Sequence, residues 1–325
     1  MISVGNLLVQ KGVKVEIYAL GFLPISGPRV SINDLLKIIK FDYHEVAYKR
    51  GRFNPLRMES IPKIDTDVTY VTGGYYYFLK QCFKSNSPTI YGFHEPALQK
   101  PTSRLQKLIV NKLFPKFDLF HLLNKVQLEI IPKESKYFIL SNTWFDEIPK
   151  STDKFEKFTI LFLGRHEVSK GIDTLEYVIN NAENDIELYI AGSGSVNLNV
   201  PKDKSNVHVL GFVEEEILEE YLSKSHAVLF PSCSEASSIV AVEALAHSTP
   251  LVYRGLPQNA LLDNIEMCLK ADNDINFLKA VNELKKQYSL NPSEYLKKCS
   301  LLPGFLMSSE TYIETFIAKA ASLIQ

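Results

Sequence analysis

The sequence lacks the features that would place it outside the cell or across a membrane. Its 325 residues include only four cysteines, and no two of them form a CxxC pair. Neither a disulfide framework nor a zinc site is therefore indicated, and we expect reduced thiols. No apolar run reaches the roughly 18 residues that a membrane-spanning helix needs, and the N-terminus does not read as a signal peptide. A cytoplasmic location is expected.

A large excess of one charge is also absent, because the formal net charge is -1. Apolar residues make up 46% of the chain and charged residues 22%, which is ordinary for a globular protein, and the length fits two domains. The charges are unevenly divided, however. Residues 1–150 hold 21 basic and 13 acidic side chains (+8), and residues 151–325 hold 15 and 24 (-9). Either the two halves meet different partners or the solvated surfaces simply differ in composition.

Strand-like and helix-like segments alternate along the chain. In the second half, short apolar runs predict strands at 158–164, 186–194, 206–212, 227–232 and 250–254, with helices at 171–182 and 214–225 between them. This order is typical of right-handed βαβ units in a doubly wound parallel sheet. The first half repeats the pattern less regularly, with strands at 13–20, 67–74, 88–95 and 119–124 and a helix at 105–114. The polar segment 141–158 is predicted to be the linker.

Two loops of the second half are candidates for a ligand site, because open α/β sheets bind ligands at the carboxyl ends of their strands. Arg165 and Lys170 follow one predicted strand and precede a helix, where two cations and free N–H groups favour phosphate. Gly192 lies in a glycine-rich turn after the next strand. A solvated loop with ordinary surface cations is the alternative for the first, and a common tight turn for the second.

The stretch SEASSIVAVEALAHSTPLV, residues 234–252, carries two carboxylates around a predicted helix start. Glu235 precedes the helix, and Glu243 lies about 12 Å further along it at 1.5 Å per residue. If the helix begins near Ser237, its first amides are free donors; they belong to Ser237, Ser238, Ile239 and Val240. A nucleoside diphosphate sugar, with hydroxyls at both ends and phosphate in the middle, fits this arrangement. Alternatively, Glu235 is a favourable first-turn charge and Glu243 is paired between the domains.

Four segments, in this order, resemble the C-terminal domain of the family 4 glycosyltransferases, which are retaining enzymes of the GT-B architecture. They are GRHEVSKGIDTL, IAGSG, VLGFVEEEILEEYLSKSHAVLFPS and SEASSIVAVEALAHSTPLV, within residues 158–265. The Glu-x7-Glu pair of that family is here Glu235 and Glu243. The resemblance implies two Rossmann-like parallel-sheet domains facing a central cleft. The implied boundaries are 1–145 for the acceptor-side domain, 146–310 for the nucleotide-sugar domain, and 311–325 for a C-terminal helix that packs back on the first domain.

The resemblance also implies roles for individual residues. Arg165 and Lys170 would hold the donor diphosphate, Glu243 would accept the ribose hydroxyls, and Glu235 would hydrogen-bond the transferred sugar. The backbone near Gly211 and Phe212 would contact the base. The full set of implied donor-binding residues is Arg165, Lys170, Gly192, Gly211, Phe212, Glu235, Ser237, Ser238, Ile239, Val240 and Glu243.

The first half resembles the family only in outline. His94, after the predicted strand at 88–95, takes the place of a histidine that assists catalysis through hydrogen bonding, and a structural histidine is the alternative. His94, Glu235, Arg165 and Lys170 form the expected catalytic set. Asn142 stands where the family has an asparagine before the interdomain crossing. The chain is expected to begin directly in the first helix, so either the family's first strand and glycine-rich loop are absent or the chain start was placed late. The family's usual glycine after the signature helix is replaced around His247 and Ser248.

The function expected from these observations is transfer of a hexose from a UDP- or GDP-type sugar to a glycan, lipid-linked or other acceptor. A nucleotide-sugar epimerase-like enzyme and a binding module without turnover are the alternatives. No cofactor, metal or nucleic acid is expected. An Asp-x-Asp triplet holds the divalent metal ion in glycosyltransferases of the GT-A architecture. The triplets at 65–67 and 272–274 are interpreted as decoys, because the first lies at the amino end of a predicted strand and the second in a polar turn downstream of every donor motif. The basic, amphipathic segment 100–117 is a candidate for peripheral contact with an anionic membrane, although such helices more often pack on their own domain.

Overall fold

The computed structural model describes residues 2–20, 42–46, 66–72, 86–94, 104–149 and 153–324. The chain divides into two compact units. The first consists of Met1–Ser141 together with Ser309–Gln325, and the second of Asn142–Ser308. Each unit contains its own parallel sheet, so the expected pair of Rossmann-like sheet domains is confirmed.

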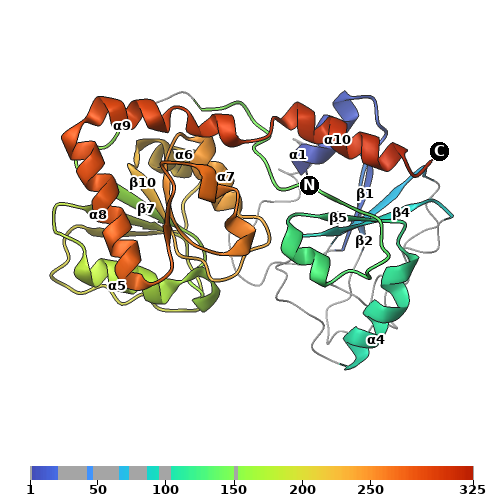
Figure 1. The fold of residues 1–325 in the computed structure, drawn as a ribbon, viewed down its shortest axis with the longest axis horizontal. Helices are drawn as coiled ribbons and strands as arrows, with labels where there is room; N and C mark the ends of the chain where they lie inside the picture. The colour runs from blue at the N-terminus through green and yellow to red at the C-terminus, as the bar shows by residue number, and fades with distance from the viewer. Residues whose placement is uncertain are drawn as a thin grey trace. The chain divides into compact units, whose positions relative to one another are not determined.

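The first unit opens with a helix and contains two parallel sheets (Figure 1). Helix α1 (Ile2–Gln10) precedes β1 (Glu16–Leu20), which pairs with β2 (Asp42–Val46). Four further strands form a parallel sheet in the order β3-β4-β5-β6. Their bounds are Thr69–Thr72, Thr89–Phe93, Leu119–Leu122 and Tyr137–Ile139. Helix α4 (Arg104–Leu113) precedes β5.

The core of this unit is rich in aromatic rings. Tyr91 and Phe93 of β4 pack against Phe114, Phe117 and Phe120, with ring centroids between 5.1 and 6.5 Å apart. Offset and edge-to-face aromatic contacts of this kind add to the free energy gained by burial. The first turn after α4 is thereby anchored, because Phe114 has no exposed surface.

The last helix of the chain, α10 (Ser309–Ala321), also belongs to the first unit. Its Phe316 ring lies 5.4 Å from the ring of Tyr70 and 6.0 Å from that of His121. Lys11, just after α1, pairs with Glu310 and Glu314 of α10 at 2.9 and 3.3 Å. The two ends of the chain are thus joined within one unit.

The second unit is built on a six-stranded parallel sheet with the order β12-β11-β10-β7-β8-β9. The strands span Thr159–Leu163 (β7), Glu187–Ala191 (β8), Val207–Gly211 (β9), Ala227–Phe230 (β10), Leu251–Arg254 (β11) and Leu269–Ala271 (β12). The chain proceeds from β7 outward to β9, returns to β10 beside β7, and then proceeds outward in the opposite direction. The strand order therefore reverses between β7 and β10.

Helices cover both faces of this sheet. Helix α5 (Ile172–Asn181) packs with α8 (Asp274–Leu290), and α6 (Glu215–Lys224) packs with α7 (Ile239–Ala246), as Figure 1 shows. Right-handed crossovers in opposite directions put the two pairs on opposite faces. Helix α9 (Pro292–Cys299) follows α8 and contacts it.

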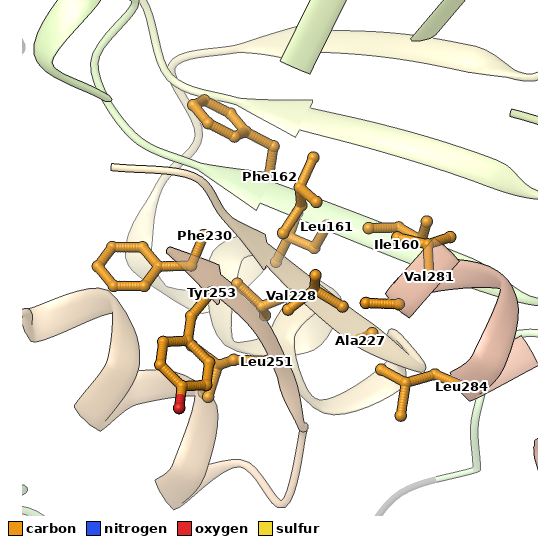
Figure 2. Packing of buried hydrophobic residues seen from close by; sticks show 14 of the residues in the cluster. Ile160, Leu161, Phe162, Ala227, Val228, Phe230, Leu251, Tyr253, Val281 and Leu284 are labelled. Carbon is orange, nitrogen blue, oxygen red and sulfur yellow. The ribbon is translucent and has the colours of Figure 1, made fainter. Parts of the chain in front are cut away.

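The centre of the second unit is a continuous apolar layer (Figure 2). Ile160 of β7 and Ala227 of β10 lie near Val281 and Leu284 of α8, and all four are at most 1% exposed. Leu161 and Val228, the next residues along the two strands, are equally buried. Strands buried on both faces consist of consecutive apolar residues, as in 160–163 and 227–230. This explains why the sequence predicted the strands of this unit well.

Helix α7 ends in a backbone conformation that favours glycine. The amide of Ser248 donates to the carbonyl of Leu245, and that of Thr249 to Ala244, which is the hydrogen-bond pattern of a Schellman motif. Ser248 has φ 56°, the one non-glycine residue in the described part of the chain with a positive φ. Ser248 therefore adopts a left-handed conformation near the point where the resemblance would place a glycine, the residue that adopts this conformation most easily.

We expect Ser248→Gly to raise the free energy of unfolding by about 0.5–1 kcal/mol, because it removes the Cβ from a left-handed residue. Urea unfolding followed by circular dichroism measures the change. Ser248→Ala is the matched control, since it removes the hydroxyl but keeps the Cβ, and it should give no stabilisation. Equal stabilisation by both variants would show that the serine hydroxyl, not the backbone, is responsible.

Candidate functional site

The reversal of strand order between β7 and β10 creates the candidate site. The loop after β7 leads to α5 on one face of the sheet, and the loop after β10 leads to α7 on the other. Because the strands are parallel, both loops leave the same edge. Ligands of open α/β sheets bind at such a reversal. The predicted residues Arg165 and Lys170 lie in the first loop, and Glu235 and Ser237 in the second.

The two loops are held in close backbone contact. Gly171, with φ 74°, is the residue between the 3-10 turn Val168–Lys170 and helix α5. A Cβ at this position would come within 2.3 Å of the carbonyl oxygen of Pro231. The same carbonyl accepts a hydrogen bond from Nε of Arg254 at 2.9 Å, and the Arg254 guanidinium also binds the Thr174 hydroxyl at 2.7 Å. Arg254 therefore fixes the second loop, a role that no local sequence pattern indicated.

Lys170 and Glu235 form an ion pair between the loops. Nζ of Lys170 lies 2.6 Å from a carboxylate oxygen of Glu235, and the side chains are 22% and 12% exposed. The structure therefore brings together the residue expected to hold phosphate and the one expected to hold sugar. Arg165 lies further out, because its side chain is 68% exposed and pairs with Glu167 at 2.8 Å.

The glycine-rich turn after β8 packs against the loop after β7. Gly192 has φ 126°, and a Cβ there would lie 1.9 Å from the carbonyl oxygen of Gly164. Its amide donates to the carbonyl of Gly211 at 2.6 Å. Gly192 therefore closes the sheet edge, and the Gly211 carbonyl is already hydrogen-bonded. Phe212, the next residue, is 55% exposed.

Helix α7 begins two residues later than the sequence analysis expected. Its first residue is Ile239, and the Ser238 side chain caps it by accepting from the amide of Ala241 at 3.2 Å. Ser237 instead binds Asn142, whose backbone amide donates to the Ser237 hydroxyl at 3.1 Å and whose side-chain amide donates to the Ser237 carbonyl at 2.9 Å. Within the described residues, the helix-start amides left without an acceptor are those of Ile239 and Val240.

Glu243 is half-buried on α7 and its carboxylate has no hydrogen-bond or ion-pair partner in the described part of the chain. Burial, together with the negative charge of Glu215, raises the pKa of this carboxyl to about 7. Glu215 is the first residue of α6, three residues after Phe212, so the loop with Gly211 and Phe212 leads toward Glu243.

In the first unit, His94 directly follows β4, at the carboxyl end of that strand. Its Nε2 lies 2.7 Å from the Tyr70 hydroxyl, which also lies 2.8 Å from Nδ1 of His121. Burial lowers the pKa of both histidines to about 4, so both rings are neutral near pH 7. Neither Tyr70 nor His121 belongs to a sequence motif, and the sequence analysis missed both.

The second Asp-x-Asp triplet forms the start of α8. Asn273 is the N-cap and accepts from the amide of Asn276 at 3.0 Å. Asp274 accepts from the Thr174 hydroxyl at 2.6 Å, and the Asp272 carbonyl accepts from Arg254 at 3.4 Å. These contacts give residues 272–274 a structural role. Of the first triplet, Asp65 lies outside the described residues.

The family comparison covers the unit that carries these loops. Residues 157–287 match the family model of the group 1 glycosyl transferases. This segment contains every predicted donor-site residue of the second unit. Residues 157–287 therefore carry a group 1 glycosyl transferase domain, and the resemblance seen in the sequence is confirmed.

Curated relatives match part of the same chain. An uncharacterized 41.2 kDa protein in the cps region of Klebsiella pneumoniae is 35% identical over 100 residues, which is 30% of this chain and 27% of the relative. A processive diacylglycerol alpha-glucosyltransferase of Acholeplasma laidlawii is 33% identical over 87 residues, 26% of this chain and 25% of that protein. The matched segment spans about a quarter of the length of each.

Solved structures share the fold. Sucrose-phosphate synthase from Thermosynechococcus elongatus superposes with a TM-score of 0.69 at 14% identity, covering 98% of this chain and 91% of its own. Anabaena HepE, solved in complex with UDP-glucose, superposes with a TM-score of 0.63 at 13% identity, covering 79% of each chain. These likenesses show the GT-B fold, and the family match assigns residues 157–287 to a group 1 glycosyl transferase domain.

The raised pKa of Glu243 predicts a pH-dependent stability. Because its pKa is about 7 in the folded chain and about 4.5 otherwise, the folded state binds the proton more tightly, and stability falls as pH rises between these values. We expect Glu243→Gln to stabilise the chain by about 1–3 kcal/mol at pH 8 and to have little effect near pH 4.5. Urea unfolding of wild type and variant across this range measures the difference.

Glu266→Gln is the control, because Glu266 is an exposed glutamate paired with Lys298 on the surface of the same unit. Its difference from wild type should stay small at every pH. A Glu243→Gln difference that does not grow with pH would contradict the assignment of an unpaired, buried carboxyl.

Proposed function

We propose that this protein is a retaining glycosyltransferase that moves a hexose from a nucleotide-diphosphate sugar to a hydroxyl acceptor. The observation that carries the proposal is the ion pair between Lys170 and Glu235 at the point where the strand order reverses. Glu235 precedes Ile239, the first residue of α7, by four positions, and the amides of Ile239 and Val240 have no acceptor in the part of the chain that the structure describes. A cation, free N–H groups and a carboxylate gathered there can bind phosphate and sugar hydroxyls together. The family match of residues 157–287 supports the same reading.

In the proposed complex, the donor diphosphate takes Lys170 as its main counter-charge. Lys170 is only 22% exposed, so its charge is screened less by water than that of Arg165, which is 68% exposed. The amides of Ile239 and Val240 add donors for the same phosphates. Charge that develops on the leaving diphosphate is stabilised by these groups, and such electrostatic stabilisation is a large term in many enzymes.

Glu235 and Glu243 are proposed to hold the two ends of the donor. Glu235 binds Lys170 in the free protein and can accept hydrogen bonds from the transferred sugar when phosphate engages Lys170. Glu243 gains two hydroxyl donors when ribose arrives, which compensates for its burial without a protein partner. The backbone at Gly211 and Phe212 is proposed to contact the base.

His94 is proposed to hydrogen-bond the transferred sugar or the acceptor hydroxyl. It stands at the carboxyl end of β4, and its neutral ring can accept or donate one hydrogen bond. The donor is proposed to be UDP- or GDP-type, and the acceptor a glycan or lipid-linked hydroxyl. The UDP-glucose complex of HepE and the diacylglycerol named for the Acholeplasma relative support these classes. An epimerase-like reaction and binding without turnover remain the competing functions; product analysis with labelled donor separates them.

Peripheral contact with an anionic membrane is proposed for α4 and the turn after it. Arg104, Lys107, Lys112 and Lys116 are exposed, and Leu108 among them is 62% exposed. A basic surface that presents an apolar side chain is suited to an acidic lipid surface. The far end of the helix is anchored in its own unit by Phe114, and Lys100 lies outside the described residues. In the described part of the chain, no helix combines the length and the hydropathy needed to cross a bilayer.

Lys170→Met should lower turnover about 100-fold, because it removes the partly buried positive charge that the proposal places at the leaving diphosphate. Wild-type turnover should persist in excess EDTA, since the proposal assigns phosphate neutralisation to side chains and amides instead of a divalent ion. Release of nucleoside diphosphate from UDP- and GDP-sugars in the presence of candidate acceptors measures both. Lys202→Met, which removes an exposed lysine of the same unit, is the control.

Two results would count against this assignment. Wild-type turnover in Lys170→Met would remove Lys170 from the phosphate site. Loss of turnover in EDTA with recovery in Mg²⁺ or Mn²⁺ would show that a metal does what we assign to Lys170 and Arg165.

The membrane proposal predicts sedimentation of the protein with vesicles that contain phosphatidylserine but not with pure phosphatidylcholine. The double variant Lys107→Glu/Lys112→Glu should remain in the supernatant, because it reverses two charges on the exposed face of α4. Lys202→Glu/Lys279→Glu makes the same charge change in the second unit and should sediment like wild type. Equal binding of both double variants would refute a specific role for α4.

A further inference from the structure

Tyr70, His94 and His121 form a hydrogen-bonded chain across three neighbouring strands. Tyr70 lies on β3, His121 on β5, and His94 follows β4 between them. The Tyr70 hydroxyl is 2.7 Å from Nε2 of His94 and 2.8 Å from Nδ1 of His121. At the far end, Nε2 of His121 is 2.8 Å from the carbonyl oxygen of Leu140.

The direction of each hydrogen bond follows from the last contact. A backbone carbonyl only accepts, so Nε2 of His121 carries a proton. Because burial lowers the pKa of His121 to about 4, the ring is neutral and its Nδ1 is an acceptor. Tyr70 must therefore donate its single proton to His121, and its oxygen is left to accept from His94. Nε2 of His94 then carries the proton.

Neighbouring residues restrict the position of the Tyr70 hydroxyl. It lies over Gly92, where a Cβ would come within 1.9 Å of the Tyr70 oxygen and 3.0 Å of Nε2 of His94. The His121 ring stacks on Phe138 with centroids 4.7 Å apart, and Phe316 of α10 packs against both rings of the Tyr70–His121 pair. His121 itself is 1% exposed. Gly92, Phe138 and Phe316 therefore restrict the positions of the Tyr70 and His121 rings.

We propose that Tyr70 and His121 are positioning residues that hold His94 in the tautomer protonated on Nε2, so that its Nδ1 is presented as a hydrogen-bond acceptor for a substrate hydroxyl. His94 is half-buried at the strand end, and the described residues provide no partner for its Nδ1. This inference rests on the proposed function for the identity of the substrate, but the tautomer itself does not. In this tautomer, Nδ1 of His94 can accept a hydrogen bond from the substrate but cannot donate one.

The first test reads the tautomer directly from the ring ¹⁵N shifts of selectively labelled full-length protein. We expect His94 to be protonated on Nε2 in the wild type. In Tyr70→Phe, which keeps the ring and removes the hydroxyl, the His94 shifts should move toward a mixture of tautomers. Gly92→Ala should act similarly without removing any hydrogen-bonding group, because its methyl displaces the Tyr70 hydroxyl. Tyr137→Phe, on the exposed face of β6, is the control.

The second test is kinetic. Tyr70→Phe should lower kcat about 10-fold with little change in donor affinity, as expected when a positioning partner is lost. In a His94→Ala background, Tyr70→Phe should cause no further loss, because its effect acts through His94. Protonation of His94 on Nδ1 in the wild type, or unchanged shifts and kcat in Tyr70→Phe, would overturn the inference. If the wild type shows no transfer, the proposed function fails while the shift measurement still decides on the tautomer.

Discussion

The neighbouring position of β7 and β10 is the constraint on which the candidate site depends. These strands are adjacent in the sheet although the sequence between them builds two further strands and two helices. Their loops meet only because Gly171 lets the backbone approach Pro231. As a result, Lys170 and Glu235, separated by 65 positions, lie within an ion-pair distance. Any change that moves one loop therefore changes the electrostatics of the other.

Much of the second unit could be predicted because its strands are buried on both faces. The apolar runs at 158–164 and 227–232 contain β7 and β10, and each ends within two residues of the predicted strand end. The start of α7 was less predictable. Ser237 and Ser238 are equally good caps by residue type, and the choice is made by Asn142, which is distant in sequence and captures Ser237.

Other features leave no local signal in the sequence. Strands β6 and β12 have three residues each, which is too short for an alternating pattern to be read. Tyr70 and His121 stand in strands as ordinary residues, and their relation to His94 depends on the register of β3, β4 and β5. His94 could be singled out only by resemblance. Its protonation state required knowledge of both neighbours.

The placement of α10 in the first unit has a consequence for synthesis. Residues 142–308 form a complete unit by themselves, whereas the first unit needs residues 309–325 as well. During synthesis, all residues of the second unit therefore leave the ribosome before the first unit has gained α10, the helix that carries Phe316. The rings of Tyr70 and His121 gain Phe316 as a packing partner only after α10 emerges, so the first unit is completed after the second.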